Sequence, residues 1–333
     1  MSRICFIYPE LPTAPRDGAE IYEADLRSVM GSIPNTSVES ATPDTPIASR
    51  PDIAVVSTRH AAKILPAALK FRLRGTTLLA VHHHSAWRQQ QGRRKWLGAA
   101  AEKILLHLAS RIVLPSPFMH ATLLYSFSPD KLLLWKIPFE KGVLPEVTPE
   151  RGRLIYVGTI EPRKGLEYLL QALSILRDKH PEIHLDIIGR TVDEEYAAAL
   201  RAQAAENQLD VEFHGFLDDI EKDRLHRRGW LFAFPSLLEG FGMVLAEAQS
   251  YSLPIVSFEN SAMPYTVKNG VNGLLCPDRD SAAMARAISR ILSDSELRSR
   301  LAAGSGAGAR TRFSHDDFRR VVTRDTRALL PKD

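Results

Sequence analysis

The sequence predicts an α/β protein built from two doubly wound parallel-sheet domains, and three observations support this class. Short apolar runs alternate along the chain with helical patterns of ten or more residues, which is the order of βαβ units. The runs are continuously apolar, as expected for parallel strands that are buried on both faces. The length of 333 residues suits two domains of about 150 residues each.

The composition indicates a globular protein and suggests the charge of its partners and its redox compartment. Apolar residues make up 44% of the chain and charged residues 25%, as in ordinary globular proteins. The formal net charge of +4 favours anionic partners, such as nucleotide phosphates, an anionic membrane or nucleic acid. Cys5 and Cys276 lie far apart in strand-like runs, so we expect buried free thiols in a reducing compartment. The apolar run at 4–8 is too short for a signal peptide or a membrane span, so we expect a cytoplasmic protein.

The first domain is expected over residues 1–145. Its strands are predicted at 3–8, 52–57, 76–81, 111–114 and 131–137, and its helices from Asp17 onward and at 61–74, 97–108 and 117–125. The apolar positions of its first helix are Ile21, Ala24, Leu26 and Val29. Gly18 forms a turn between the first strand and this helix, where open α/β sheets bind ligands. Helix capping by Asp17 is the alternative interpretation.

Three histidines, His82, His83 and His84, follow the strand predicted at 76–81. His82 and His84 would share one side of an extended chain. No cysteine or carboxylate stands near them in the sequence, which disfavours a metal site. We therefore expect one histidine to face a cleft at the carboxyl end of its strand, with a structural histidine as the alternative.

The most basic segment of the chain contains Arg88, Arg93, Arg94 and Lys95 together with Trp87 and Trp96. It is predicted to precede a helix whose apolar positions are Leu97, Ala101, Ile104, Leu105 and Leu108. Cations at a helix amino terminus oppose the helix dipole, so we expect a contact with an anionic membrane or an anionic acceptor. A solvated surface turn is the alternative. A nucleic-acid-binding function would depend on this segment alone, and we expect no nucleic acid partner.

The second domain is expected over residues 151–312, after a linker at 138–149 that is rich in proline. Its strands are predicted at 154–157, 184–188, 211–214, 230–234, 254–258 and 273–276, and its helices at 166–177, 194–207, 220–227, 243–251 and 281–292. The tail at 314–330 carries Phe318, Val321, Val322 and Leu329 on one helical face. We expect that face to pack against another part of the protein.

Two strand–helix junctions carry the charged residues that suggest chemistry. In one, Arg163 and Lys164 stand just before a helix, where two cations beside free N–H groups suit a pyrophosphate. In the other, Gly240 and Gly242 bracket Phe241, and Glu239 and Glu247 stand on either side of this turn. An ordinary junction whose glutamates face solvent is the alternative. The Rossmann and P-loop glycine motifs are absent at the Arg163–Lys164 junction, which disfavours dinucleotide redox chemistry and P-loop hydrolysis.

The spacing of the two glutamates differs from that of the two catalytic carboxylates of a glycosidase. Residues eight apart in one helix are displaced by about 12 Å along its axis. Glu239 and Glu247 are therefore not expected at the roughly 5–5.5 Å of a double-displacement glycosidase. They fit better at two ends of one extended ligand such as a nucleotide-sugar, whose diphosphate would lie between them.

Three segments resemble the group-1 retaining glycosyltransferases of family 4, which have the GT-B fold. They are 157–165, 235–242 with Glu247 and Ala248, and 270–275. The resemblance implies two Rossmann-like domains facing a central cleft, and a last helix, 313–333, that crosses back to the first domain. It also implies sugar transfer with retention from a nucleotide-diphosphate-sugar, with no obligatory metal and no cofactor.

The resemblance assigns a role to each matching residue. It implies that Arg163 and Lys164 neutralise the departing diphosphate, that Glu247 binds the ribose and that Glu239 holds the sugar and phosphates. In the first domain His82 would contact the transferred sugar, and Gly18 would lie near the phosphates. The other donor-binding positions are Gly158, Thr159, Gly189, Arg190, Phe216, Leu217, Gly240, Phe241, Gly242, Met243 and Val244.

Some residues depart from the family pattern. Thr159 stands where the family usually has arginine, and Tyr265 where a glutamate is expected. The sequence predicts a retaining glycosyltransferase of cell-surface polysaccharide or lipid-linked glycan biosynthesis. No side chain clearly supplies a nucleophile on the β face, so we expect front-face attack by the acceptor. The alternative is a catalytically silent GT-B protein that binds nucleotide or scaffolds a partner transferase.

Overall fold

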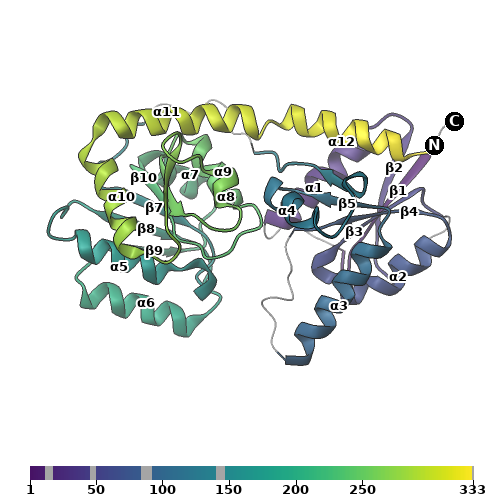
Figure 1. Cartoon of the computed structure of the whole chain (residues 1–333), viewed down its shortest axis with the longest axis horizontal. Helices are drawn as coiled ribbons and strands as arrows, with labels where there is room; N and C mark the ends of the chain where they lie inside the picture. The colour runs from purple at the N-terminus through teal and green to yellow at the C-terminus, as the bar shows by residue number, and fades with distance from the viewer. Residues whose placement is uncertain (12–17, 46–49, 84–91, 140–146, 332–333) are drawn as a thin grey trace. The chain divides into compact units, whose positions relative to one another are not determined.

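The computed structural model describes residues 1–11, 18–45, 50–83, 92–139 and 147–331. The chain divides into two compact units (Figure 1). Unit 1 comprises Met1–Pro138 and His315–Asp333, and unit 2 comprises Phe139–Ser314. Within the described residues each unit contains a six-stranded sheet in which every pair of neighbouring strands is parallel. The predicted doubly wound α/β class is confirmed.

Unit 1 has the strand order β2-β1-β3-β4-β5-β6. The strands are β1 Ser2–Ile7, β2 Thr36–Ala41, β3 Ile53–Ser57, β4 Thr77–Val81, β5 Arg111–Leu114 and β6 Leu132–Leu134. The helices are α1 Gly18–Gly31, α2 Ala61–Leu73, α3 Gly92–Leu108, α4 Pro117–Leu123 and α12 His315–Leu329. Buried residues of α2 and α3 join those of β3, β4 and β5 in one apolar cluster, so both helices cover the same face of the sheet.

The last helix, α12, packs within unit 1 against α1. The rings of Tyr22 and Phe318 lie 5.8 Å apart. The Tyr22 hydroxyl donates to the carbonyl of Trp135 at 2.6 Å, and the Trp135 indole donates to Asp325 at 2.8 Å. The Trp135–Asp325 hydrogen bond, which is part-buried, and the Tyr22–Phe318 ring contact therefore hold α12 against the rest of unit 1.

Unit 2 has the strand order β12-β11-β10-β7-β8-β9. The strands are β7 Arg153–Val157, β8 His184–Ile188, β9 Val211–Gly215, β10 Leu231–Phe234, β11 Ile255–Phe258 and β12 Gly273–Cys276. The helices are α5 Leu166–Leu176, α6 Glu194–Glu206, α7 Asp219–Arg228, α8 Met243–Ser250, α9 Met263–Thr266, α10 Ser281–Ser293 and α11 Ser295–Arg312. An aspartate side chain caps the amino terminus of four of them, at Asp193, Asp218, Asp280 and Asp294.

Several details of the sequence prediction are wrong. Strand β2 and helices α9 and α11 are not predicted, and the last strand of unit 1 ends at Leu134. Helix α3 begins at Gly92, so Arg93, Arg94 and Lys95 lie inside it, while Arg88 lies outside the described residues. Leu97 and Ile104 are exposed, because Ala101, Leu105 and Leu106 set the buried face of α3. Ile21 is exposed for the same reason, since the buried face of α1 is centred on Tyr22 and Leu26.

The cysteines follow the prediction. Cys5 and Cys276 are both buried and free. Burial raises the pKa of the Cys5 thiol to about 12 and that of Cys276 to about 11, which suppresses thiolate chemistry. Among the described residues, no helix combines the length and the apolar character that crossing a membrane requires.

Candidate functional site

The candidate site lies where the strands β7, β8, β9 and β10 of unit 2 end. These strands are neighbours in the sheet and run parallel. Their carboxyl ends therefore meet at one edge, which is where sheets of this class bind ligands. The loops that follow them contain most of the residues predicted from the sequence.

Two glycines allow the loops after β7 and β8 to approach closely. The Gly158 amide donates to the carbonyl of Ile188 at 2.9 Å. A Cβ atom on Gly189 would lie 1.9 Å from the Gly158 carbonyl oxygen, and Gly189 has a φ of +150°. A side chain at position 189 would force these two loops apart.

A second close approach joins the loops after β7 and β10. The residues Pro162–Lys164 form a short 3₁₀ turn, η4, which ends at Gly165 with a φ of +65°. A Cβ atom on Gly165 would lie 2.4 Å from the Pro235 carbonyl oxygen. The Leu237 amide donates to the Arg163 carbonyl at 2.9 Å. The chain can therefore place Arg163 and Lys164 directly against the segment that contains Glu239.

Glu239 is the centre of a charged cluster. Its Oε1 atom lies 2.5 Å from Lys164 Nζ and 3.4 Å from Arg163 Nη1, and it accepts a hydrogen bond from the Ser236 hydroxyl at 2.9 Å. Burial alone would raise the pKa of this carboxyl group, but Lys164 and Arg163 hold its pKa below the ordinary value. Glu239 is thus a carboxylate kept ionised by two cations.

A second carboxylate balances the cluster. Glu161 Oε1 lies 2.7 Å from Arg163 Nη2 and accepts from the Thr159 hydroxyl at 2.8 Å. Two cations therefore face two carboxylates, Glu161 and Glu239. An anionic ligand that binds here would compete with these carboxylates for Arg163 and Lys164.

The turn before α8 provides main-chain donors beside this cluster. Gly242 caps the helix with a φ of +76°, and Phe241 is buried beside it. The amides of Met243 and Val244 belong to the first turn of α8, where N–H groups have no partner within the helix. Such a turn suits phosphate oxygens.

Glu247 has a different partner from Glu239. Its Oε1 atom lies 3.0 Å from Nζ of Lys222 on α7, and the Glu247 side chain is only 8% exposed. Burial opposes the charge of Lys222, but Glu247 and Asp219 raise its pKa. The two glutamates therefore belong to two separate ion pairs.

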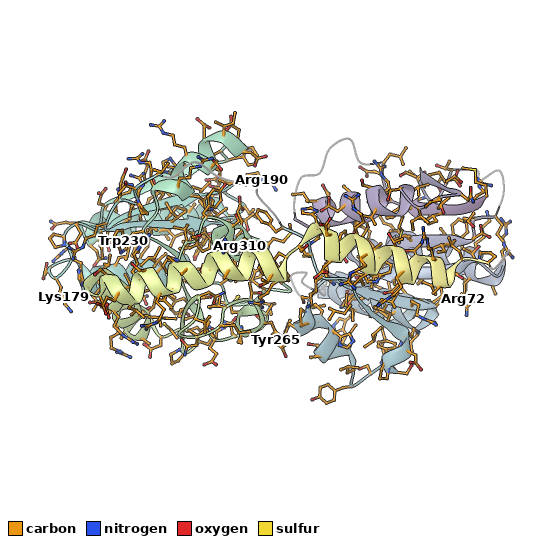
Figure 2. The ribbon with its side chains drawn as sticks, turned by 90° about the horizontal axis from the view of Figure 1, so that it is seen from above. Arg72, Lys179, Arg190, Trp230, Tyr265 and Arg310 are labelled. Atoms are coloured by element: carbon orange, nitrogen blue, oxygen red, sulfur yellow. The ribbon has the colours of Figure 1, made fainter. Side chains whose placement is uncertain are left out.

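The remaining predicted residues of unit 2 lie at strand ends with different exposures. Arg190, labelled in Figure 2, is exposed in the loop after β8. Phe216 is 75% exposed after β9, whereas Leu217 packs against the core.

Gly18 and His82 belong to unit 1, unlike the other predicted site residues. Gly18 is the first residue of α1. His82 is buried at the end of β4, and its Nδ1 atom lies 2.9 Å from the Thr58 hydroxyl. The predicted cap residue, Asp17, and His84 both lie outside the described residues.

A buried pair next to His82 was not foreseen. His83 Nε2 lies 3.0 Å from Glu23 Oε1, and both side chains are nearly inaccessible to solvent. Burial alone would raise the pKa of Glu23, but its contacts with His83 and Ser57 lower it. The sequence shows Glu23 only as a polar residue in an amphipathic helix, so no local pattern predicts this pair.

One group of potential metal ligands occurs in the described part of the chain. His184, Asp186 and Glu212 place ligand atoms within 4.8 Å of one another on β8 and β9. Arg153 already contacts Asp186, with Nε at 2.7 Å and Nη2 at 2.8 Å. A cation in direct contact opposes a second one, so these residues form an ion-pair network rather than a convincing metal site.

Three residues that border the site have no role predicted from the sequence. Glu161 and Ser236 stand inside the motif segments quoted above, and their positions beside Arg163 and Glu239 could have suggested a supporting role. Lys222 lies in a helix without any motif. Only the packing of α7 near α8 reveals its contact with Glu247.

Comparisons with known proteins agree with this geometry. The family described as "Glycosyl transferases group 1" matches residues 145–305. Phosphatidyl-myo-inositol mannosyltransferase of Mycobacterium leprae is 35% identical over 168 residues, which cover 50% of this chain and 44% of that protein. Glycogen synthase of Mycobacterium tuberculosis is 32% identical over 54% of this chain and 42% of its own length. The chain therefore spans less than half the length of these curated relatives.

Solved structures resemble the chain over nearly its full length. Sucrose-phosphate synthase from Thermosynechococcus elongatus has a TM-score of 0.79 at 20% identity, covering 99% of each chain. Anabaena HepE in complex with UDP has a TM-score of 0.81 at 17% identity, covering 98% of this chain and all of the other. At these identities the likeness shows the fold. Residues 145–305 match the group 1 glycosyltransferase family, and the chain has the GT-B fold.

Proposed function

We propose that this protein is a glycosyltransferase that moves a sugar from a nucleotide-diphosphate-sugar to a glycan, lipid-linked or small-molecule acceptor. The observation that carries this proposal is the cluster of Arg163, Lys164 and Glu239 at the strand ends, with Glu247 one helix away. The relatives named above include a mannosyltransferase and a glycogen synthase, and one structural neighbour was solved with UDP. These support a nucleotide-sugar donor here.

The proposed binding step exchanges partners within the cluster. The diphosphate attracts Lys164 and Arg163, which releases the Glu239 carboxylate from its 2.5 Å contact with Lys164. Glu239 then accepts hydrogen bonds from sugar hydroxyls. The first-turn amides of α8 hold phosphate oxygens. Glu247 accepts from the ribose while it remains close to Lys222.

The proposed chemical step depends on charge. As the bond from the sugar to the diphosphate breaks, negative charge grows on the leaving group, and fixed cations and amides stabilise it. We propose retention through front-face attack, in which the acceptor oxygen approaches beside the leaving phosphate and gives it the proton. We also propose that the reaction requires no metal ion and no cofactor. A covalent glycosyl–enzyme adduct trapped by mass spectrometry would overturn the front-face step.

A second candidate is a catalytically silent protein that binds nucleotide or scaffolds a partner transferase. One observation favours it. Arg163 and Lys164 already have carboxylate partners, and Thr159 stands where another cation would add to the phosphate contacts. A site with little excess positive charge binds a diphosphate more weakly.

The proposed setting is the cytoplasm, with peripheral contact to an anionic membrane through the basic segment Arg88, Arg93, Arg94 and Lys95. The mild basic excess of the chain supports an anionic partner. The buried free thiols support a reducing compartment.

The test is a screen of nucleoside diphosphates by calorimetry, followed by donor hydrolysis and transfer assays. We expect Glu239→Ala to lower kcat by a factor of about 10²–10³, because it removes the carboxylate that orients the sugar and the cations. Glu195→Ala, which changes an exposed glutamate on α6, is the control. Wild-type kcat in Glu239→Ala would contradict the site assignment. Nucleotide binding without turnover of any donor would favour the silent protein.

A further inference from the structure

The outward side of α2 and α3 is apolar, although it faces solvent. Leu69 and Leu73 on α2 are 47% and 80% exposed. On α3, Trp96, Leu97 and Ile104 are 77%, 67% and 52% exposed. Proteins that stay monomeric rarely expose large apolar side chains in such concentration, and a patch of this kind usually marks an interaction surface.

On α2 these residues belong to a regular stripe. Ala62, Pro66, Leu69 and Leu73 are all exposed and follow one another at intervals of four, three and four residues. This spacing places them on one side of the helix, away from the buried Ile64. The stripe therefore contributes nothing to the core of unit 1.

The exposed residues of the two helices face the same way. Buried residues of both helices pack into one cluster over one face of the sheet, and the helices contact each other. Their opposite sides must therefore point away from that face together. Figure 1 shows α2 and α3 next to each other in unit 1.

Cations accompany the apolar residues, and acids do not. Lys63, Lys70 and Arg74 are exposed along or just after α2, and Lys103 is exposed on α3. Helix α2 contains no acidic residue, and the only acid of α3, Glu102, is buried. None of these four cations forms an ion pair with a carboxylate within the described residues. Their charge is therefore available to an anionic partner.

A basic recess lies at the end of both helices. It has a volume of about 490 Å³ and is lined by Arg72 and His107 from the two helices together with Arg111, Asp130 and Lys131. Arg72 is labelled at the surface of unit 1 in Figure 2. Burial and the neighbouring Arg72 lower the pKa of Lys131, and an anion bound beside it would oppose this effect.

We propose that the outward side of α2 and α3 is a docking surface for an anionic lipid bilayer. The apolar stripe would enter the boundary between headgroups and acyl chains, while the lysines and arginines meet lipid phosphates. A second copy of the chain is a poorer occupant, because it would bring the same cations face to face. The inference deepens the membrane part of the proposed function. It assigns the contact to α2 and the outward side of α3, whereas the sequence suggested the basic segment Arg88, Arg93, Arg94 and Lys95.

The experiment measures binding of the full chain to vesicles of phosphatidylcholine alone and to vesicles that also contain phosphatidylglycerol. We expect binding to the anionic vesicles that weakens as salt is added. Leu69→Ser with Leu73→Ser should lower vesicle affinity at least tenfold, because the apolar area that enters the bilayer is lost. Lys70→Ala should lower it about fivefold.

Control variants distinguish binding through this surface from nonspecific apolar and electrostatic binding to vesicles. Ile175→Ser and Ile220→Ser change exposed apolar residues of unit 2, and Lys179→Ala removes an exposed cation there. We expect all three to bind like the wild type. Equal binding of the Leu69/Leu73 variant and the wild type, at equal thermal stability, would overturn the proposal. So would a dimer in sedimentation velocity that dissociates in the same variant.

The readout does not depend on catalysis. Vesicle binding is measured without donor or acceptor. The docking proposal can therefore be tested even if the protein proves to be catalytically silent. Turnover of a water-soluble acceptor without any vesicle binding would leave the proposed transfer reaction intact and would refute the docking surface. The two proposals can therefore fail separately.

Discussion

Removing Lys164 should expose how strongly the candidate site depends on its central ion pair. In Lys164→Ala, the Glu239 carboxylate loses a partner at 2.5 Å and keeps Arg163 at 3.4 Å and Ser236 at 2.9 Å. Removal of one partner from a buried pair costs about 3–5 kcal/mol when nothing replaces it. Because Arg163 and Ser236 remain, we expect the free energy of unfolding of unit 2 to fall by about 2 kcal/mol at pH 7.

The effect should depend on pH in a definite direction. The folded protein lowers the pKa of Glu239 below its ordinary value of 4.5. The resulting stabilisation is complete above pH 4.5 and is lost as the pH falls through the lowered pKa. Lys164→Ala weakens that lowering. The difference in stability between wild type and variant should therefore shrink at acid pH.

The assay is equilibrium urea unfolding followed by the fluorescence of Trp230, the only tryptophan in the sequence of residues 139–314. Trp87, Trp96 and Trp135 are replaced by phenylalanine in both proteins, so the signal reports on unit 2. Arg300→Ala, which removes an exposed cation of α11, is the control and should change stability by less than about 0.5 kcal/mol. A Lys164→Ala difference that is equally large at pH 7 and pH 3 would refute the reasoning.

Two further substitutions test other features of the structure. Gly165→Ala adds a Cβ atom 2.4 Å from the Pro235 carbonyl at a φ of +65°, whereas Gly270→Ala, at +77°, meets no atom within 4 Å. Calorimetry should show a loss of about 1 kcal/mol for Gly270→Ala and at least about 2 kcal/mol for Gly165→Ala, and equal losses would exclude the clash. Glu23→Gln should destabilise the protein by about 1–3 kcal/mol at pH 7. Because its contacts with His83 and Ser57 lower the pKa of Glu23 against the effect of burial, that loss should fade below the usual carboxyl range in thermal unfolding, and a constant loss would contradict an ionised Glu23.

Much of the fold could be predicted because parallel strands buried on both faces are uniformly apolar. Strand β2, Thr36–Ala41, is an edge strand with mostly half-buried residues, and its sequence TSVESA carries little apolar signal. Helix α11 was missed because Gly304, Gly306 and Gly308 argue against a helix. A Cβ atom on Gly304 would lie 2.0 Å from the Val271 carbonyl oxygen, so this glycine serves close packing. Local propensity cannot reveal such a tertiary requirement.

The candidate site was predictable where its residues share a local pattern. Arg163, Lys164 and Glu239 stand in two junctions, and the pairing of β7 with β10 brings those junctions together. The pairing of Lys222 with Glu247 depends on how two helices pack, which no short motif encodes. The roles assigned to these residues in binding and transfer remain predictions.

The exposed side of α3 shows why helical periodicity can mislead. Leu97 and Ile104 fit an apolar pattern together with Ala101, Leu105 and Leu108, so the sequence places all five in the core. The structure buries Ala101 and Leu105 but exposes Leu97 and Ile104. When the apolar face of a helix is wider than its buried face, some apolar residues stay exposed and can contact a partner. Periodicity alone does not distinguish these residues from those of the core.

The contact of α12 with α1 has a consequence for how the protein is made on the ribosome. Unit 1 begins at Met1, but its packing includes Phe318 and Asp325, which follow the whole of unit 2 in the sequence. At typical synthesis rates, the delay between Pro138 and α12 is on the order of ten to a few tens of seconds. During that interval the buried side of α1 lacks its helical cover. Unit 2, which is continuous in sequence, can finish folding first, even though unit 1 begins to emerge before it.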